Sequence, residues 1–139
     1  MTAARTYFED IVVDRVQLTP AITVTEAHVA MYQGLTREVP LESSDVPDVL
    51  PLCMAIGLGW RVKDPPMAVQ AFVGLEWKVV KELRVGDTMH TSSRIISKRP
   101  MRDSGLIVDE RTILDQHGEV VQQARFTFLV AKRQKEASA

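Results

Sequence analysis

The spacing of hydrophobic residues separates a helical first half of the chain from a strand-rich second half. In residues 23–33 apolar side chains recur every three or four positions, which predicts a helix with one apolar face. Thr23 and Glu26 have the spacing of a capping box at its start, and Gly34 suits its end. The apolar stripe consists of Val24, Ala27, Ala30 and Met31.

Residues 49–62 have a different pattern, because almost every position from Val49 to Val62 is apolar. Asp48 can cap a helix here, Pro51 is tolerated in a first turn, and Pro65 ends the segment. A helix that is apolar on every side must be buried on every side. One sheet covers only one side of a helix, so a second subunit is the simplest source of the remaining cover.

The second half of the chain predicts strands, which we place at residues 68–80, 88–97, 106–114 and 119–131, with a bend at 83–87. Residues 115–118 favour a hairpin between the last two strands. An antiparallel sheet of about five strands with one long buried helix indicates an α+β fold. We expect a single domain over residues 1–139, frayed at 1–6 and 134–139.

Composition narrows the class of protein without giving a function. The chain has 139 residues, a net charge of −1 and a single cysteine. We therefore expect no nucleic-acid-binding surface, no membrane span and no disulfide framework. We expect a cytoplasmic location. The histidines His28, His90 and His117 have no ligand spacing with one another or with the cysteine, so we expect no metal site and no cofactor.

Several stretches together resemble the MaoC-like hot-dog family, which contains (R)-specific enoyl-CoA hydratases and 3-hydroxyacyl-ACP dehydratases. The resemblance runs from YFEDI at residues 7–11 to FLVAKR at 128–133, and is strongest at 22–29, 74–100 and 118–133. It implies a sheet wrapped around a central helix near 49–62. It also implies dimers whose sheets join, and an acyl-CoA or acyl-carrier-protein thioester as substrate.

The catalytic motif of that family, Gly-Asp-x-Asn-Pro-x-His, is altered in this chain. Aligning Pro40 with the motif proline places Glu38 near the aspartate position and Glu42 at the histidine position. Two carboxylates could serve as an acid/base pair if their surroundings drove their pKa values apart. The alternative is that both are solvated acids in a polar loop.

The resemblance also suggests groups that would bind the thioester. The backbone amides of Leu52 and Cys53 stand where helix-terminal donors would polarise the carbonyl. We expect the Cys53 side chain itself to be a small buried hydrophobe. Lys98 and Arg99, in a polar turn, could meet the phosphates of CoA or of a phosphopantetheine arm, or could simply be solvated.

Three functions follow from the sequence. The first is a hydratase or dehydratase of 2-enoyl thioesters with an altered acid/base pair. The second is a catalytically silent hot-dog subunit that binds acyl chains or partners an active dehydratase subunit. For the chain in general we expect a homodimer or a heteromer with another hot-dog subunit. The third is a hot-dog thioesterase, which the lack of an acid within residues 49–62 disfavours.

Overall fold

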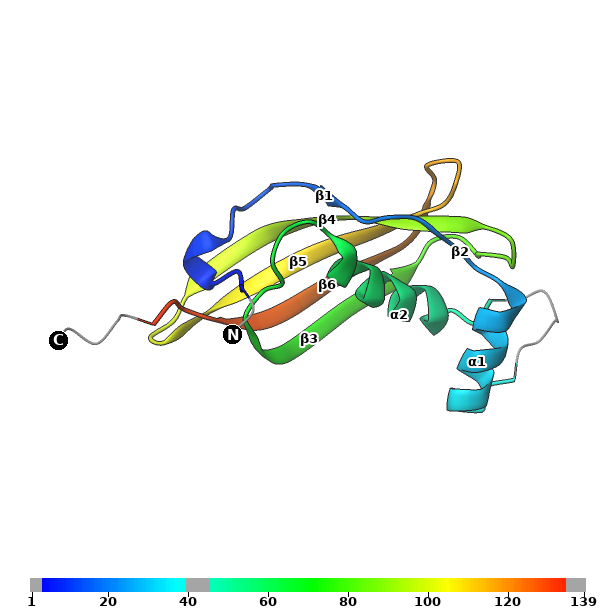
Figure 1. Cartoon of the computed structure of the whole chain (residues 1–139), viewed down its shortest axis with the longest axis horizontal. Coiled ribbons are helices and arrows are strands. Elements are labelled where there is room, and N and C mark those ends of the chain that lie inside the picture. The colour runs from blue at the N-terminus through cyan, green and yellow to red at the C-terminus, as the bar shows by residue number, and fades with distance from the viewer. Residues whose placement is uncertain (1–3, 40–45, 135–139) are drawn as a thin grey trace.

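The sheet is antiparallel and contains four long strands and two short ones. The computed structural model describes residues 4–39 and 46–134. The strand order is β1-β4-β5-β6-β3, and β2 also pairs with β4. This arrangement confirms the four predicted long strands (Figure 1). The strand bounds are β1 Gln17–Leu18, β2 Ile22–Thr23, β3 Val69–Val79, β4 Thr88–Pro100, β5 Ser104–Leu114 and β6 Val120–Ala131.

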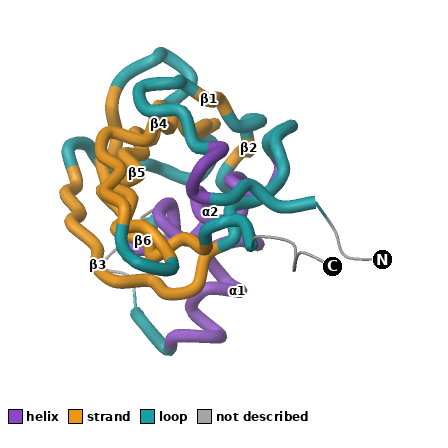
Figure 2. The backbone as a smooth tube through the Cα atoms, turned by 90° about the vertical axis from the view of Figure 1, so that its left-hand side faces the viewer, coloured by secondary structure: helices purple, strands orange, loops and turns teal. Residues whose placement is uncertain are grey.

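The central helix lies against one face of the sheet, and the sheet curls around it (Figures 1 and 2). Helix α2 spans Val49–Leu58 and continues as the 3-10 turn η2, Gly59–Arg61, so the α-helix ends four residues before the predicted boundary. The buried face of the helix consists of Leu50, Pro51, Leu52, Ala55 and Leu58. An α+β fold with a sheet wrapped around the helix at 49–62 is therefore confirmed.

Within a single chain this helix is buried on one side only, so its predicted burial on every side requires the second subunit. One stripe of α2 and η2, here called the outer stripe, faces away from the sheet; Val49 and Ile56 in it are 39% and 38% exposed. Strand β3 is the free edge of the sheet and is also exposed, with Phe72 and Val73 at 53% and 58%. The outer stripe consists of Val49, Cys53, Ile56, Gly57 and Trp60.

The first helix begins later than the sequence predicts. Helix α1 spans Glu26–Thr36, and its N-cap is Thr25 rather than Thr23. The Thr25 hydroxyl accepts a hydrogen bond from the His28 amide at 3.3 Å, and His28 Nδ1 accepts one from the Thr25 amide at 3.0 Å. Thr23 is instead drawn into β2 by pairing with Thr88. His28 therefore completes the cap, in the place predicted for Glu26.

The core divides into two apolar clusters on the inward face of the sheet. One lies around Leu50, Met89 and Ile113 between the two helices and the sheet, and the other lies around Phe8, Ile107 and Phe126. Between them β5 turns Asp109 inward, where it is 5% exposed. None of the helices in the described part of the chain has the length and apolar character needed to cross a membrane.

Candidate functional site

The start of α2 is fixed to the sheet by a buried side chain. Gln122 of β6 is 2% exposed, and its Nε2 donates a 2.7 Å hydrogen bond to the Asp48 carbonyl. Its Oε1 accepts one from Trp77 Nε1 of β3 at 3.0 Å. Asp48 occupies the N-cap position, but its side chain makes no capping bond, contrary to the sequence expectation. Backbone and glutamine contacts, rather than an aspartate cap, therefore set where the helix begins.

One of the two predicted catalytic carboxylates is connected to α2 through Tyr32 of α1. Glu38 is exposed just after α1, and its Oε2 accepts a 2.8 Å hydrogen bond from the hydroxyl of Tyr32. Burial raises the pKa of Tyr32 to about 12, with smaller contributions from Glu38 and from Cys53 of α2. Tyr32 also packs against the cluster that contains Leu50. The structure thus brings Tyr32, Glu38 and the first half of α2 together. Glu42, the other predicted carboxylate, lies outside the described residues.

The two predicted carbonyl-binding amides lie at the fourth and fifth positions of α2. At these positions a backbone amide ordinarily donates to the carbonyl four residues earlier in the helix. Leu52 faces the core and Cys53 is exposed. The expectation of a buried Cys53 side chain is therefore wrong, because the residue lies on the outer stripe.

The predicted phosphate-binding residues lie at the other end of the sheet from the start of α2 (Figure 1). Lys98 and Arg99 belong to β4 rather than to a turn. Lys98 Nζ donates hydrogen bonds of 2.8 and 2.9 Å to the carbonyls of Phe8 and Ile11 and lies 4.5 Å from the centre of the Phe8 ring. These contacts hold the 3-10 turn η1, Phe8–Asp10, on the sheet. Arg99 is exposed.

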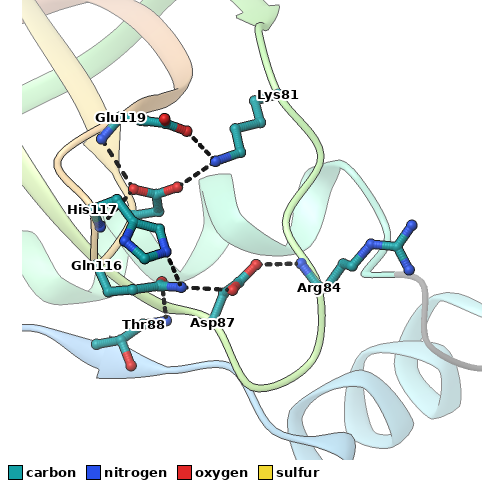
Figure 3. Close-up of polar contacts among 8 residues, drawn as sticks. Lys81, Arg84, Asp87, Thr88, Gln116, His117 and Glu119 are labelled. Atoms are coloured by element: carbon teal, nitrogen blue, oxygen red, sulfur yellow. Dashed lines mark hydrogen bonds and ion pairs between the residues drawn. The ribbon is translucent and has the colours of Figure 1, made fainter.

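A polar network closes the same end of the sheet as the start of α2 (Figures 1 and 3). Lys81, between β3 and β4, pairs with Glu119 and with Asp115 in the β5–β6 hairpin. The Lys81 ammonium is the main reason that the pKa of Asp115 falls to about 2. The Gln116 side chain accepts from the Thr88 amide at 3.0 Å and donates to Asp87 at 2.9 Å. This network connects the loop between β3 and β4 to the β5–β6 hairpin, and we interpret its role as stabilising the two loops against each other.

The described residues contain no cluster of three or more histidine, cysteine, aspartate or glutamate side chains arranged to hold a metal. His28 caps α1, and His117 lies in the hairpin of the network, where its amide donates to Asp115 at 2.9 Å. His90 is a half-buried residue of β4.

Sequence reasoning missed Tyr32 and Gln122. Gln122 had a usable signal, since it shares the inward face of β6 with Ala124, Phe126 and Phe128, and a lone amide on an apolar face needs buried partners. Tyr32 had none, because its contact with Glu38 depends on the left-handed backbone of Arg37 (φ 66°) that follows α1.

Solved structures of other proteins superimpose on this chain and support the assignment of the fold. No family model and no curated protein matches the sequence. Among solved structures, a monoamine oxidase regulatory protein from Archaeoglobus superimposes with a TM-score of 0.85 and 23% identity, over 94% of this chain and 97% of that one. A MaoC-like dehydratase from Rhodospirillum rubrum gives 0.78 and 18%, over 93% and 99%.

A conserved protein from Mycobacterium tuberculosis that is described as a double hot-dog fold gives a TM-score of 0.78 and 18% identity. The chain has a hot-dog fold. The match covers 97% of this chain and 47% of the Mycobacterium chain, so this hot-dog domain corresponds to about half of that protein. Tyr32 and Glu38 lie in and just after α1, outside the sheet and α2.

Proposed function

We propose that this chain is a MaoC-like hydratase or dehydratase of 2-enoyl thioesters whose site lies at the start of α2. The observation that carries the proposal is the 2.8 Å bond between the Glu38 carboxylate and Tyr32, whose side chain lies near the first half of the central helix. The resemblance of the sequence to MaoC-like proteins and the overlap with a MaoC-like dehydratase support the reaction class.

In the proposed reaction water adds across the C2=C3 bond of the substrate. Glu38 removes a proton from the water as its oxygen bonds to C3, and the Tyr32 hydroxyl holds the carboxylate in place. The electron pair of the double bond moves toward the thioester carbonyl, whose developing negative charge the positive end of α2 stabilises. A proton delivered to C2 completes the addition, and dehydration is the reverse sequence.

The remaining sequence-predicted residues keep their roles as parts of this proposal. Glu42 would deliver the proton to C2. The amides of Leu52 and Cys53 would bind the carbonyl only by giving up the bonds that amides at these positions ordinarily make within the helix. Lys98 and Arg99 would bind substrate phosphates. Lys98 could do so only by leaving the two carbonyls that it now holds, at 2.8 and 2.9 Å.

The exposed apolar surface supports a second subunit over the outer stripe and the free edge of β3. An edge strand with exposed apolar side chains is an open template for pairing with another strand. We propose that the partner is a second copy of this chain, paired through β3 of each copy. The two-domain organisation of the Mycobacterium protein supports such a pairing of hot-dog units.

The activity is tested by following hydration of crotonyl-CoA and of longer 2-enoyl-CoA substrates. We expect Glu38→Gln to lower kcat about 100-fold, because it removes the base, and Tyr32→Phe to lower it about tenfold, because the base is no longer held. Glu26→Gln is the matched control, since it removes an exposed carboxylate from the opposite end of α1. Equal activity of Glu38→Gln and Glu26→Gln would exclude the role given to Glu38.

The same assay separates the two alternative functions. Release of free thiol from saturated acyl-CoA would indicate a thioesterase. Acyl-CoA binding without turnover would favour the silent subunit, whose active partner should then co-purify from the native host. Light scattering tests the pairing with a second copy. We expect a dimer that Val73→Lys on β3 converts to a monomer, while Asp103→Lys, in the β4–β5 turn away from β3, leaves the dimer intact.

A further inference from the structure

A cavity of about 130 Å³ lies between the sheet and the second half of the central helix. Its walls include Ala55 of α2, Gly59 of η2 and the inward faces of β4 and β5, and its rim is formed by the N-terminal segment and by residues 64–67. This volume exceeds that of a single water molecule several-fold. The cavity lies at the end of α2 opposite to the site at Tyr32 and Glu38.

An ion pair is built into the floor of this cavity. Arg111 Nε donates a 2.9 Å hydrogen bond to Asp109 Oδ2; their side chains are 14% and 7% exposed. The guanidinium lies 4.5 Å from the centre of the Phe126 ring, and Gly59 has no side chain that would cover it. Arg111 lines the cavity, and among the described residues its guanidinium makes no other hydrogen bond, so its two terminal nitrogens are unpaired there.

The neighbouring strand adds an unsatisfied hydroxyl to the same floor. Thr91 is 1% exposed, and its Oγ1 is the one buried side-chain polar atom in the described part of the chain without a hydrogen-bond partner. Ser93 pairs directly with Arg111 across the two strands, and Thr91 pairs with Ile113, one inward position along. Directly opposed side chains lie about 5 Å apart and diagonal ones about 7–8 Å, so the Ser93 hydroxyl is the nearer of the two to Arg111 and Thr91 is its diagonal neighbour.

Packing alone does not account for these groups. A buried ion pair and an unpaired hydroxyl cost stability, and apolar residues of similar volume would join the two core clusters into one. The guanidinium is planar, so its two terminal nitrogens present parallel N–H bonds when Nε is held by Asp109. Two parallel N–H donors match the two oxygens of a carboxylate. Asp109 thus serves as the positioning residue, and Thr91 and Ser93 can donate to the same acceptor.

We propose that this cavity binds a carboxylate group through Arg111, Thr91 and Ser93. The carboxylate could belong to a free small organic acid or to the far end of a dicarboxylic acyl thioester. The second source rests on the function proposed above, whereas the first does not. A bound cation is disfavoured because each carboxylate that lines the cavity, on Asp10, Asp64 and Asp109, is already paired with an arginine.

The test is an NMR titration of the full chain with four probes: succinate, its neutral analogue succinamide, succinyl-CoA and butyryl-CoA. Stronger binding of succinate than of succinamide identifies the free acid as the source. Tighter binding of succinyl-CoA than of butyryl-CoA identifies the end of an acyl chain. Binding of butyryl-CoA by itself reports on the thioester site, so a failure there is distinguishable from a failure of the cavity proposal.

Two variants assign the binding to the cavity. We expect Arg111→Lys to weaken carboxylate binding at least tenfold, because lysine keeps the charge but lacks the two parallel N–H donors of the guanidinium. We expect Thr91→Val to weaken it about fivefold, because it removes the hydroxyl donor. Arg125→Lys, on the outward face of the adjacent strand β6, is the matched control and should bind as the parent does. If Arg111→Lys does not fold, the carboxylate affinity of Thr91→Val tests whether the cavity is the binding site. No preference for either carboxylate over its neutral counterpart, or unchanged binding in every folded variant, overturns the proposal.

Discussion

The side-chain amide of Gln122 donates a 2.7 Å hydrogen bond to the carbonyl of Asp48, 74 residues earlier in the chain. This bond joins the inward face of β6 to the start of α2. The same glutamine accepts from Trp77, so one buried side chain connects β3, β6 and the helix. The position of the helix start on the sheet, and with it the site at Glu38, depends on this contact.

Replacing Gln122 with leucine should lower the free energy of unfolding by about 1–3 kcal/mol, because the buried Trp77 Nε1 and the Asp48 carbonyl lose their partner. Denaturant unfolding measures this change. Gln123→Leu is the matched control on the opposite face of β6 and should change stability by less than about 0.5 kcal/mol. Equal effects of the two substitutions would mean that the hydrogen bonds of Gln122 add nothing to stability.

The Lys81–Asp115 pair should make stability depend on pH in the acid range. The pKa of Asp115 is lowered from 3.8 to about 2, mainly by its hydrogen bond with Lys81. A carboxyl with a depressed folded-state pKa contributes stability above the unfolded value, and this contribution is lost as the pH falls toward the folded value. We expect Asp115→Asn to weaken the loss of stability between pH 3.8 and about 2.

The measurement is thermal unfolding across that range of pH. Asp103→Asn removes an exposed carboxylate in the β4–β5 turn and serves as the control. The same acid dependence in Asp115→Asn as in the parent chain would contradict the role of the pair.

The buried pair of Asp109 and Arg111 should behave unequally in single and double substitutions. Arg111→Met leaves a buried carboxylate without its cation and should destabilise the fold by about 3 kcal/mol or more. Asp109→Val combined with Arg111→Met should be neutral or stabilising, because neither charge is then desolvated. Chemical denaturation of the three chains gives the coupling, and a double variant as unstable as Arg111→Met would refute this account.

Gly105 should not tolerate a side chain while Phe8 is present. A Cβ on Gly105 would overlap the ring of Phe8, which η1 places over β5. We expect Gly105→Ala to destabilise the fold by about 1–3 kcal/mol. The effect should shrink when Phe8 is also replaced by leucine, which a double-mutant cycle measures. Gly74→Ala is the control, since a Cβ there has no atom within 4 Å.

The predictability of individual elements follows from the range of the interactions that determine them. The helix over residues 49–58 is predictable from local signals, namely the apolar run and a proline that is tolerated in the first turn. The start of α1 is not local in this sense: pairing of Thr23 with Thr88 moves the cap to Thr25. The inward charges of β5 follow the two-residue period through Ile107, Asp109, Arg111 and Ile113, but their pairing requires the folded sheet.

In the candidate site, too, some features are predictable from the sequence and others depend on contacts between distant residues. The sequence marks Glu38 as a candidate, but its contact with Tyr32 exists only because Arg37 turns the chain back toward α1. The polar neighbours of Lys98 predict a turn, whereas the strand pairing of β4 with β5 extends through this residue to Pro100.

The α+β class, the four long strands and the apolar central helix follow from the amino-acid pattern, because the periods of apolar residues are set by the geometry of single elements. The folded sheet is needed to fix which face of that helix stays exposed, which polar side chains meet beneath it and which tyrosine lies against it. Those relationships join residues far apart in the chain, and their free energy arises only when the sheet has closed around the helix.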